Sequence, residues 1–286
     1  MISVIIPALN EENSIVLTVK EVLRVLASLD MMDAEVIIID DGSSDSTGKL
    51  ATEAGAKVIR HPHNMGYGFS LKTGIKAARF DTIVITDADG TYPIEAIPKL
   101  LEEYEKGFNL VVGSRTGRYY RESLLKMPLR IVLRWLVEFV VGHSVPDINS
   151  GLRVFSKQDI LPYFNHLCDS FSFTTSMTLA YSMTKKFLTY IPITYHKRIG
   201  KTKVRLLRDS LRTLQYIVQA ALYYNPLKIF IVLCFLVLFC SVIFFMISII
   251  FNFLSAFILG IGCILLTIII FALGLIADLL RQIMVK

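Results

Sequence analysis

The feature that most constrains this chain is a segment near its C-terminus, residues 229–277, that contains no charged residue. Asn252 and Ser255 interrupt it, so it divides into two apolar spans, at about 229–251 and 254–277. Each span is long enough for the roughly 20 helical residues that cross a bilayer. Soluble core helices rarely run this long without a polar face, which disfavours a buried helix pair. With a mean hydropathy of +0.56, the sequence predicts a multi-pass membrane protein with a C-terminal transmembrane hairpin.

The charges beside the hairpin predict its orientation. Lys228 precedes the first span, Arg281 and Lys286 follow the second, and the connection around Asn252 is uncharged. Because basic flanks tend to stay in the cytoplasm, we expect both termini and the domain before the hairpin to be cytoplasmic. Residues 1–7 lack a basic region and a cleavage site, so we interpret them as a strand rather than a signal peptide.

The cysteines predict neither a zinc site nor a disulfide framework. The four cysteines show no C-x-x-C spacing; Cys168 lies before the spans, and the other three lie within them, Cys234, Cys240 and Cys263. This usage is consistent with a reducing compartment.

The first part of the chain, up to about residue 156, alternates strand-like and helix-like segments. We expect strands at 2–6, 35–40, 57–60, 82–86 and 109–113, and helices near 11–29, 46–54, 67–79 and 94–106. This order predicts an α/β domain of parallel βαβ units with right-handed crossovers. A further helix is expected at 123–142. Two more helices and a short strand at 188–193 are expected within residues 157–200.

A basic amphipathic helix is expected at 204–224, directly before the first span. Arg205, Arg208 and Arg212 share one helical face, and an apolar face is supplied by Leu207, Leu211, Leu214, Ile217 and Val218. Such a helix beside a membrane span usually lies in the headgroup plane, although a solvated face on an ordinary packing helix is the alternative. The predicted domains are therefore 1–200, a juxtamembrane segment at 201–225, and the hairpin at 226–286.

Two carboxylates, Asp87 and Asp89, follow the apolar run 82–86, and Gly90 comes next. Residues i and i+2 at the end of a strand point the same way, so both carboxylates can converge at the sheet edge where open α/β sheets bind ligands. Mg²⁺ and Mn²⁺ suit such oxygen ligands and commonly bridge carboxylates to substrate phosphates. An acidic turn is the alternative reading of the same residues.

Polar motifs also end the first two predicted strands and open a third helix. In Pro7-Ala8-Leu9-Asn10-Glu11-Glu12, we expect Asn10 to cap the following helix. In the motif that begins Asp40-Asp41-Gly42-Ser43, Asp41 is the better candidate for contacting a base or ribose. The glycines in Asn64-Met65-Gly66-Tyr67-Gly68 match neither a Walker A loop nor the pattern G-x-G-x-x-G.

In this order, these motifs and Gly113-Ser114-Arg115 closely resemble the family-2 glycosyltransferases of GT-A fold. Two later motifs, Asp147-Ile148-Asn149-Ser150-Gly151-Leu152-Arg153 and Arg198-Ile199-Gly200-Lys201-Thr202-Lys203, resemble the polyprenyl-phosphate branch. That branch includes dolichol-phosphate mannose synthase and the bacterial undecaprenyl-phosphate glucosyl and aminoarabinosyl transferases. The resemblance implies a Rossmann-like, mostly parallel GT-A catalytic domain with juxtamembrane amphipathic helices and a transmembrane hairpin.

The resemblance also implies residue roles. A nucleoside pocket would be lined by Pro7, Glu11 and Asp41, while Asp87 and Asp89 would hold Mg²⁺ or Mn²⁺ on the diphosphate. The acceptor phosphate would be contacted by Arg115, Arg130, Arg134, Arg198, Lys201 and Lys203. Asp147 would lie beside the reacting anomeric centre, so the catalytic residues would be Asp147, Asp89 and Arg115.

The chain departs from the family pattern at two positions. Leu9 stands where the family often has an aromatic residue, and Thr91 stands where it often has a glutamine ligand. The shorter Thr91 hydroxyl would contact the metal through water.

The implied activity is transfer of a hexose from a nucleoside diphosphate sugar, UDP-glucose or GDP-mannose, to undecaprenyl or dolichyl phosphate, with inversion. A processive polysaccharide synthase is disfavoured because Ile131 replaces the glutamine of Gln-x-x-Arg-Trp and only one hairpin is present. The alternative from another class is a catalytically silent, membrane-tethered nucleotide-sugar binding protein. No nucleic-acid partner is expected, and the resemblance is compatible with a homo-oligomer.

Overall fold

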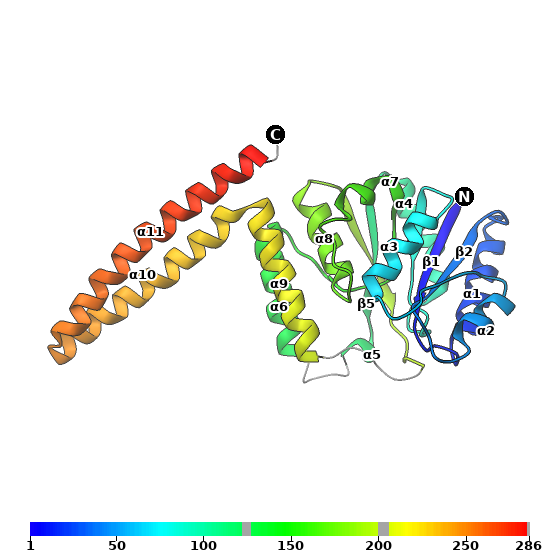
Figure 1. Ribbon diagram of the computed structural model, residues 1–286, viewed down its shortest axis with the longest axis horizontal. Helices are drawn as coiled ribbons and strands as arrows, with labels where there is room; N and C mark the ends of the chain where they lie inside the picture. The colour runs from blue at the N-terminus through cyan, green and yellow to red at the C-terminus, as the bar shows by residue number, and fades with distance from the viewer. Residues whose placement is uncertain (122–126, 200–205, 285–286) are drawn as a thin grey trace. The chain divides into compact units, whose positions relative to one another are not determined.

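The computed structural model describes residues 1–121, 127–199 and 206–284, and it divides into two compact units, Met1–Tyr216 and Ile217–Lys286. The first unit holds a seven-stranded sheet, and the second holds the helix pair α10 and α11 (Figure 1). The division falls within helix α9, so the boundaries predicted at residues 200 and 225 stay predictions.

The sheet has the strand order β3-β2-β1-β4-β6-β5-β7. Its strands are β1 (Ile2–Ala8), β2 (Glu35–Asp40), β3 (Lys57–Arg60), β4 (Thr82–Ile85), β5 (Leu110–Thr116), β6 (Arg153–Ser156) and β7 (Leu188–Thr194). All pairings are parallel except those of β6, which runs antiparallel to both β4 and β5. The predicted mostly parallel α/β domain is confirmed, and the carboxyl ends of the other six strands meet at one edge.

Strand β6 was not predicted from the sequence. It is only four residues long, Arg153 and Ser156 stand at its ends, and it directly follows the motif 147–152. Such a short segment lacks the period-2 or continuous apolar pattern that marks a strand. It lies between β4 and β5 and is antiparallel to both, which is why the sheet is mostly and not entirely parallel.

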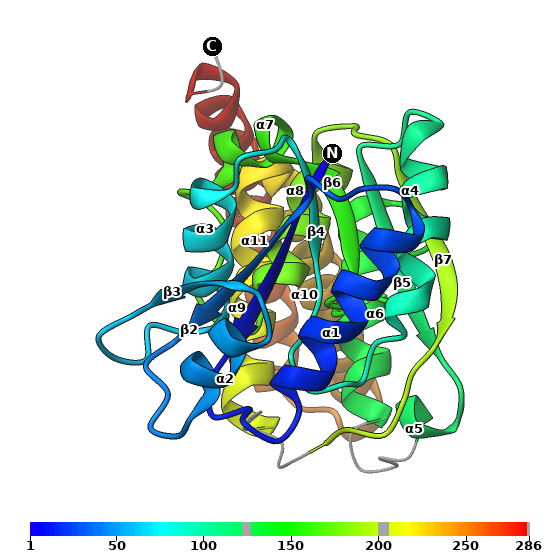
Figure 2. The same ribbon diagram turned by 90° about the vertical axis from the view of Figure 1, so that its right-hand side faces the viewer.

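Helices cover both faces of the sheet because alternate strand residues point to opposite sides. On one face Val4 and Ile6 pack with α1 (Ile15–Ser28) and α4 (Ile97–Glu105), and on the other Ile5 packs with α3 (Tyr67–Ala77) and α8 (Phe173–Met183) (Figure 2). The remaining elements of this unit are α2 (Thr47–Glu53), η1 (Ile94–Ala96), α5 (Arg118–Arg121), α6 (Met127–Val141), α7 (Lys157–Ile160) and η3 (Leu161–Tyr163).

The predicted capping role of Asn10 is wrong. The N-cap of α1 is Ser14, and Asn10 instead has a left-handed backbone with φ of 48°. Its Oδ1 accepts hydrogen bonds from the backbone N and the Oγ of Ser44, at 2.8 and 3.2 Å. Asn10 therefore joins the loop after β1 to the loop after β2, which shapes the sheet edge.

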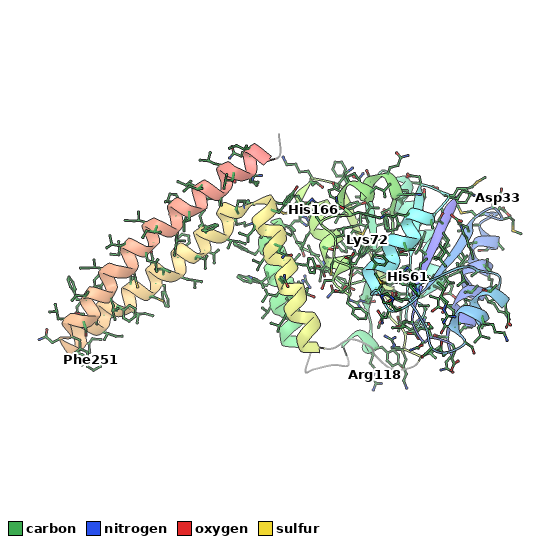
Figure 3. All side chains as sticks on the ribbon, viewed as in Figure 1. Asp33, His61, Lys72, Arg118, His166 and Phe251 are labelled. Atoms are coloured by element: carbon green, nitrogen blue, oxygen red, sulfur yellow. The ribbon has the colours of Figure 1, made fainter. Side chains whose placement is uncertain are left out.

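The second unit contains the predicted spans. Helices α10 (Pro226–Phe251) and α11 (Leu254–Met284) are both long and apolar enough to cross a membrane, and Phe251, labelled in Figure 3, ends the first of them. Asn252 turns the chain in the left-handed region. The helices approach closely where Ser241 Oγ donates to the carbonyl of Gly260, at 2.8 Å, and where Gly274 lies against Phe230.

Helix α9 (Leu206–Tyr224) matches the amphipathic helix predicted at 204–224. Leu211 and Leu214 on its predicted apolar face are exposed. Arg205 and the side chains of Arg208 and Arg212 lie outside the described residues, so the basic face stays a prediction.

Candidate active site

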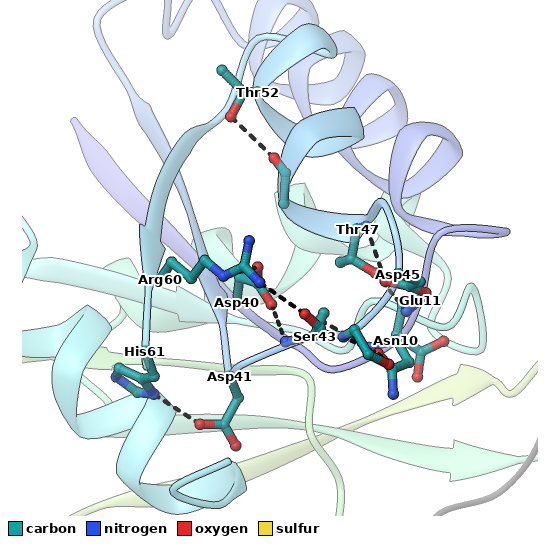
Figure 4. Close-up of polar contacts among 12 residues, drawn as sticks. Asn10, Glu11, Asp40, Asp41, Ser43, Asp45, Thr47, Thr52, Arg60 and His61 are labelled. Atoms are coloured by element: carbon teal, nitrogen blue, oxygen red, sulfur yellow. Dashed lines mark hydrogen bonds and ion pairs between the residues drawn. The ribbon is translucent and has the colours of Figure 1, made fainter. Parts of the chain in front are cut away.

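The loops after β1 and β2 lie side by side and are joined by hydrogen bonds (Figure 4). Thr47, the first residue of α2, accepts a hydrogen bond on its Oγ1 from the backbone N of Glu11, at 2.8 Å, which holds the buried Glu11 at the sheet edge. Pro7 is buried within β1 beside Ile39 of β2. The structure therefore places the predicted nucleoside residues Pro7, Glu11 and Asp41 on neighbouring strand ends.

Asp41 supports a loop. Its two carboxylate oxygens accept hydrogen bonds from the backbone N of Met65 and Gly66, at 2.8 and 2.9 Å. His61 Nδ1 lies 2.8 Å from Asp41 Oδ1, and His61 Nε2 lies 3.1 Å from Thr73 Oγ1. Asp41 thus fixes the start of α3, and its carboxylate is already engaged in this arrangement.

Asp87 and Asp89 lie just past β4, as predicted. Tyr67 Oη donates to Asp87 Oδ1 at 2.8 Å, and the backbone N and Oγ1 of Thr91 donate to Asp89 Oδ1 at 3.1 and 2.5 Å. Burial, followed by the neighbouring charge of Asp89, raises the pKa of Asp87 to about 7. Two close carboxylates of this kind favour a nearby cation.

The residues present fit a divalent cation such as Mg²⁺ or Mn²⁺. Carboxylate oxygens are hard ligands, and the raised pKa of Asp87 reflects its burial and then repulsion by Asp89, both of which a bound cation would offset. Within the described residues no group of three or more His, Cys, Asp or Glu side chains could hold a metal. A cation at Asp87 and Asp89 would therefore take its other ligands from groups of another kind, such as substrate oxygens or water. Thr91 orients Asp89, and its water-mediated metal contact stays a prediction.

Arg198 links this carboxylate pair to Glu11 in the loop after β1. Its Nη1 lies 3.1 Å from Asp89 Oδ2, and its Nη2 lies 2.9 Å from Glu11 Oε1. The backbone fixes this segment as well, because Ile199 N donates to the carbonyl of Asp89 at 3.1 Å. The segment after β7 thus reaches the ends of both β1 and β4.

Arg115 and Asp147 form an ion pair on the other side of the site, in which Asp147 is buried and Arg115 is half-buried. Arg115 donates to Asp147 Oδ2 from its backbone N and Nε, at 3.0 and 2.7 Å, and to Oδ1 from Nη2 at 2.8 Å. Asn149 N also donates to Oδ1, at 3.2 Å. Burial alone would raise the pKa of Asp147, but the Arg115 guanidinium outweighs it, so this pKa lies below its usual value. Asp147 is therefore a weak base that orients Arg115.

The loop 147–151 connects the two halves of the site. At one end Asp147 holds Arg115, and at the other Gly151 lies so close to Asp87 that an added Cβ would be 2.8 Å from its Oδ1. Ser150 Oγ donates to the carbonyl of Gly113 at 2.5 Å, and Gly151 N donates to Tyr92 Oη at 2.6 Å. Glycine at position 151 is required for this close approach.

Three predicted acceptor residues lie outside the described residues: Lys201 and Lys203 entirely, and Arg130 in its side chain. Arg134 lies within the described residues, and its Nε donates a hydrogen bond to Glu138 Oε1 on the same helix, at 3.0 Å, rather than to the Arg115 and Asp147 pair. The structure thus brings together Glu11, Asp89 and Arg198, and separately Arg115 and Asp147.

Sequence reasoning assigned no role to Tyr67, Tyr92 or Arg153, which orient Asp87 and the loop 147–151. Tyr67 and Arg153 lie within the motifs 64–68 and 147–153 that carry the family resemblance, and that position is the signal the sequence holds for them. Their roles depend on contacts between distant segments, which no local pattern contains.

Comparison with known proteins identifies relatives for most of the chain. Residues 3–172 match the model of glycosyl transferase family 2. A low-salt glycan biosynthesis hexosyltransferase of Haloferax volcanii is 31% identical over 220 residues, covering 75% of this chain and 52% of that protein. This chain thus spans about half the length of that relative. A dolichyl-phosphate hexose transferase of the same organism is 29% identical, covering 71% of this chain and 86% of that protein.

An undecaprenyl-phosphate 4-deoxy-4-formamido-L-arabinose transferase of Pectobacterium carotovorum is 27% identical, covering 80% of this chain and 69% of that protein. Among solved structures, glucosyl-3-phosphoglycerate synthase of Mycobacterium tuberculosis with Mg²⁺ and UDP superposes with a TM-score of 0.62. It is 21% identical, with 77% of this chain and 79% of that chain covered. This likeness confirms the predicted GT-A-like fold.

Proposed function

The chain belongs to glycosyl transferase family 2, and we propose that it transfers a hexose from a nucleoside diphosphate sugar to a polyprenyl phosphate at a membrane. One observation carries the proposal: the loop 147–151 joins the carboxylate pair, which suits a diphosphate with its cation, to the Arg115 guanidinium, which suits a phosphate. The named acceptors of two relatives, dolichyl phosphate and undecaprenyl phosphate, support this assignment.

On the donor side, Glu11 and Asp41 would line the nucleoside pocket, and Asp87 and Asp89 would hold Mg²⁺ or Mn²⁺. A bound cation would supply positive charge to the diphosphate leaving group. Tyr67 and Thr91 hold the two carboxylates in place by donating hydrogen bonds. UDP-glucose and GDP-mannose are the two donors to compare first.

On the acceptor side, Arg115 would bind the lipid phosphate and Asp147 would keep its guanidinium oriented. A phosphate monoester has a second pKa near 6, so it is largely ionised at neutral pH and needs no strong base. The paired, low-pKa Asp147 is consistent with that requirement. Because one nucleophile suffices, we expect a single displacement with inversion at the anomeric carbon.

The acceptor would be reached from the membrane surface. The two apolar helices could span a bilayer, and exposed apolar side chains on α6 and α9, such as Ile131, Trp135 and Leu211, suit the interface. In this proposal the catalytic unit is cytoplasmic, and the basic flanks Lys228 and Arg281 support that orientation.

The test uses membranes that contain the full-length protein, Mg²⁺ or Mn²⁺, labelled UDP- and GDP-sugars, and a short polyprenyl phosphate. We expect labelled lipid from one donor class, its formation abolished by EDTA and by Asp89→Asn, and NMR of the product showing the inverted anomer. Nucleotide-sugar binding without transfer to any polyprenyl phosphate would contradict the proposal and favour the silent binding protein.

A further inference from the structure

Arg153 is a charged side chain in an unusual place. It stands at the start of β6 with an exposed fraction of 0%, and it is the largest of the fully buried side chains described. Its hydrogen bonds go to neutral oxygens: Nη2 donates to the carbonyl of Ile148 at 2.9 Å, Nε to the carbonyl of Ser150 at 2.8 Å, and Nη1 to Thr178 Oγ1 at 2.9 Å.

A buried guanidinium carries a large desolvation cost, and a leucine would fill the same volume without it. Hydrogen bonds to neutral acceptors offset this desolvation cost only in part. Burial also lowers the pKa of Arg153, in keeping with an unfavourable environment for its charge. Filling the core therefore does not explain an arginine here, and its specific geometry must matter.

The planar guanidinium presents several donors in a fixed arrangement, which a lysine cannot reproduce. Two of these donors bind the backbone carbonyls of Ile148 and Ser150, on either side of Asn149, so Arg153 fixes the backbone of the loop 147–151. The ends of that loop carry the Asp147 contact to Arg115 and the Gly151 contact to Asp87. A shift of the loop would move both contacts together.

We propose that Arg153 is a positioning residue for the transfer reaction, which fixes the loop 147–151 so that Arg115 and Asp87 keep a productive separation. The inference rests on the proposed function, because that separation sets the distance between acceptor phosphate and donor diphosphate. Arg153 itself does not touch substrate in this role.

Three variants of the full-length protein test the inference. Arg153→Met removes all three hydrogen bonds, and Arg153→Lys keeps a charge but loses the planar arrangement. Of the three Arg153 hydrogen bonds, Thr178→Val removes only the one to α8, together with the bond from Thr178 Oγ1 to the carbonyl of Thr174 inside that helix, so it is the matched control. Each is measured for kcat per folded enzyme, for KM of the lipid phosphate, and for hydrogen exchange of peptides covering residues 146–153.

We expect kcat of Arg153→Met to fall ~100-fold, the cost of a displacement of about 1 Å near reacting groups, with a raised KM for the lipid phosphate. Exchange should speed up in the loop and stay unchanged in β1 and β2. Arg153→Lys should fold normally and still lose at least ~10-fold, whereas Thr178→Val should stay within ~3-fold of the native enzyme.

Two results would overturn the inference. In the first, Arg153→Met and Arg153→Lys lower yield or stability while kcat per folded enzyme is unchanged. In the second, Thr178→Val loses as much activity as Arg153→Met, which would make the contact with α8 the important one. If the native protein transfers no sugar, the proposed function fails, and hydrogen exchange still decides whether Arg153 fixes the loop.

Discussion

The Asp147 carboxylate is paired with the Arg115 guanidinium, and this determines what its substitution should do. Asp147→Asn keeps the shape but leaves the half-buried Arg115 without its counter-charge. We expect kcat to fall ~100-fold because the guanidinium loses its fixed orientation. Steady-state transfer assays check this, with Asp33→Asn, on an exposed loop and labelled in Figure 3, as the control. Near-native turnover of Asp147→Asn would show that Arg115 needs no such support.

The same pair predicts a pH dependence of stability. The folded pKa of Asp147 is lowered, so the pair's contribution is complete above the unfolded value of about 3.9 and is lost as the pH falls through the folded pKa. The difference in unfolding free energy between the native protein and Asp147→Asn should therefore shrink as the pH drops below about 4. Denaturant unfolding at pH 3 to 7 measures it, and a constant difference would contradict the assignment.

Tyr67 should tune the carboxylate pair without touching substrate. Its hydroxyl donates to Asp87 Oδ1, which favours the ionised carboxylate. Tyr67→Phe should weaken Mn²⁺ binding ~10-fold, the usual scale for losing a partner that orients a metal ligand. Electron paramagnetic resonance of free Mn²⁺ gives the affinity. Tyr163→Phe loses a comparable hydroxyl contact, to Thr184, and should bind Mn²⁺ like the native protein.

At the scale of elements, the segment after β7 holds the ends of two other strands. Arg198 neutralises Glu11 and Asp89 together, so it competes with a cation for Asp89 Oδ2. Arg198→Gln should tighten Mn²⁺ binding several-fold while lowering transfer, and Lys197→Gln next to it is the matched control. Calorimetric titration with Mn²⁺ separates the two effects. Weaker Mn²⁺ binding in Arg198→Gln would mean that Arg198 supports the metal site.

The elements also show what a sequence can predict. Strands β1, β2 and β4 can be predicted from their apolar runs, such as Val36 to Ile39 in β2. The polar turn residues that follow these runs locate Asp41, Asp87 and Asp89, because both patterns are local in the sequence. The ion pair between Glu11 and Arg198 joins residues 187 positions apart, so it depends on the parallel pairing of β7 with β5. Strand β6 was not predicted because it begins with Arg153. A charged residue does not fit the apolar pattern of a buried strand, although this arginine is fully buried.

The hairpin depends on glycine where its helices touch. A Cβ on Gly274 would lie 2.6 Å from Phe230 Cβ, whereas a Cβ on Gly262 would meet nothing within 4 Å. Gly274→Ala should destabilise the helix pair by about 1–3 kcal/mol, and Gly262→Ala should not. The buried Cys234 in the same pair should then react faster with a maleimide in detergent, with exposed Cys240 as the reference. Equal reactivity in both variants would show that the helices adjust freely.

At the scale of the whole molecule, the proposed reaction requires a defined membrane topology. A cytoplasmic donor and a lipid phosphate can meet only if residues 1–199 face the cytoplasm, and the basic residues Lys228 and Arg281 favour that orientation. The two helices are long and apolar enough for each to cross once, and in that case the turn at Asn252 faces the opposite side of the membrane.

Single cysteines introduced at Asn252 and at the exposed Asp33 distinguish the two orientations, in a background where the four native cysteines are serine. In intact cells a membrane-impermeant maleimide should label Asn252→Cys and leave Asp33→Cys unlabelled until the membrane is opened. Labelling of Asp33→Cys in intact cells would reverse the topology and place the site outside, away from cytoplasmic nucleotide sugars. Labelling at neither position would mean that α10 and α11 form a hairpin that enters the bilayer without crossing it.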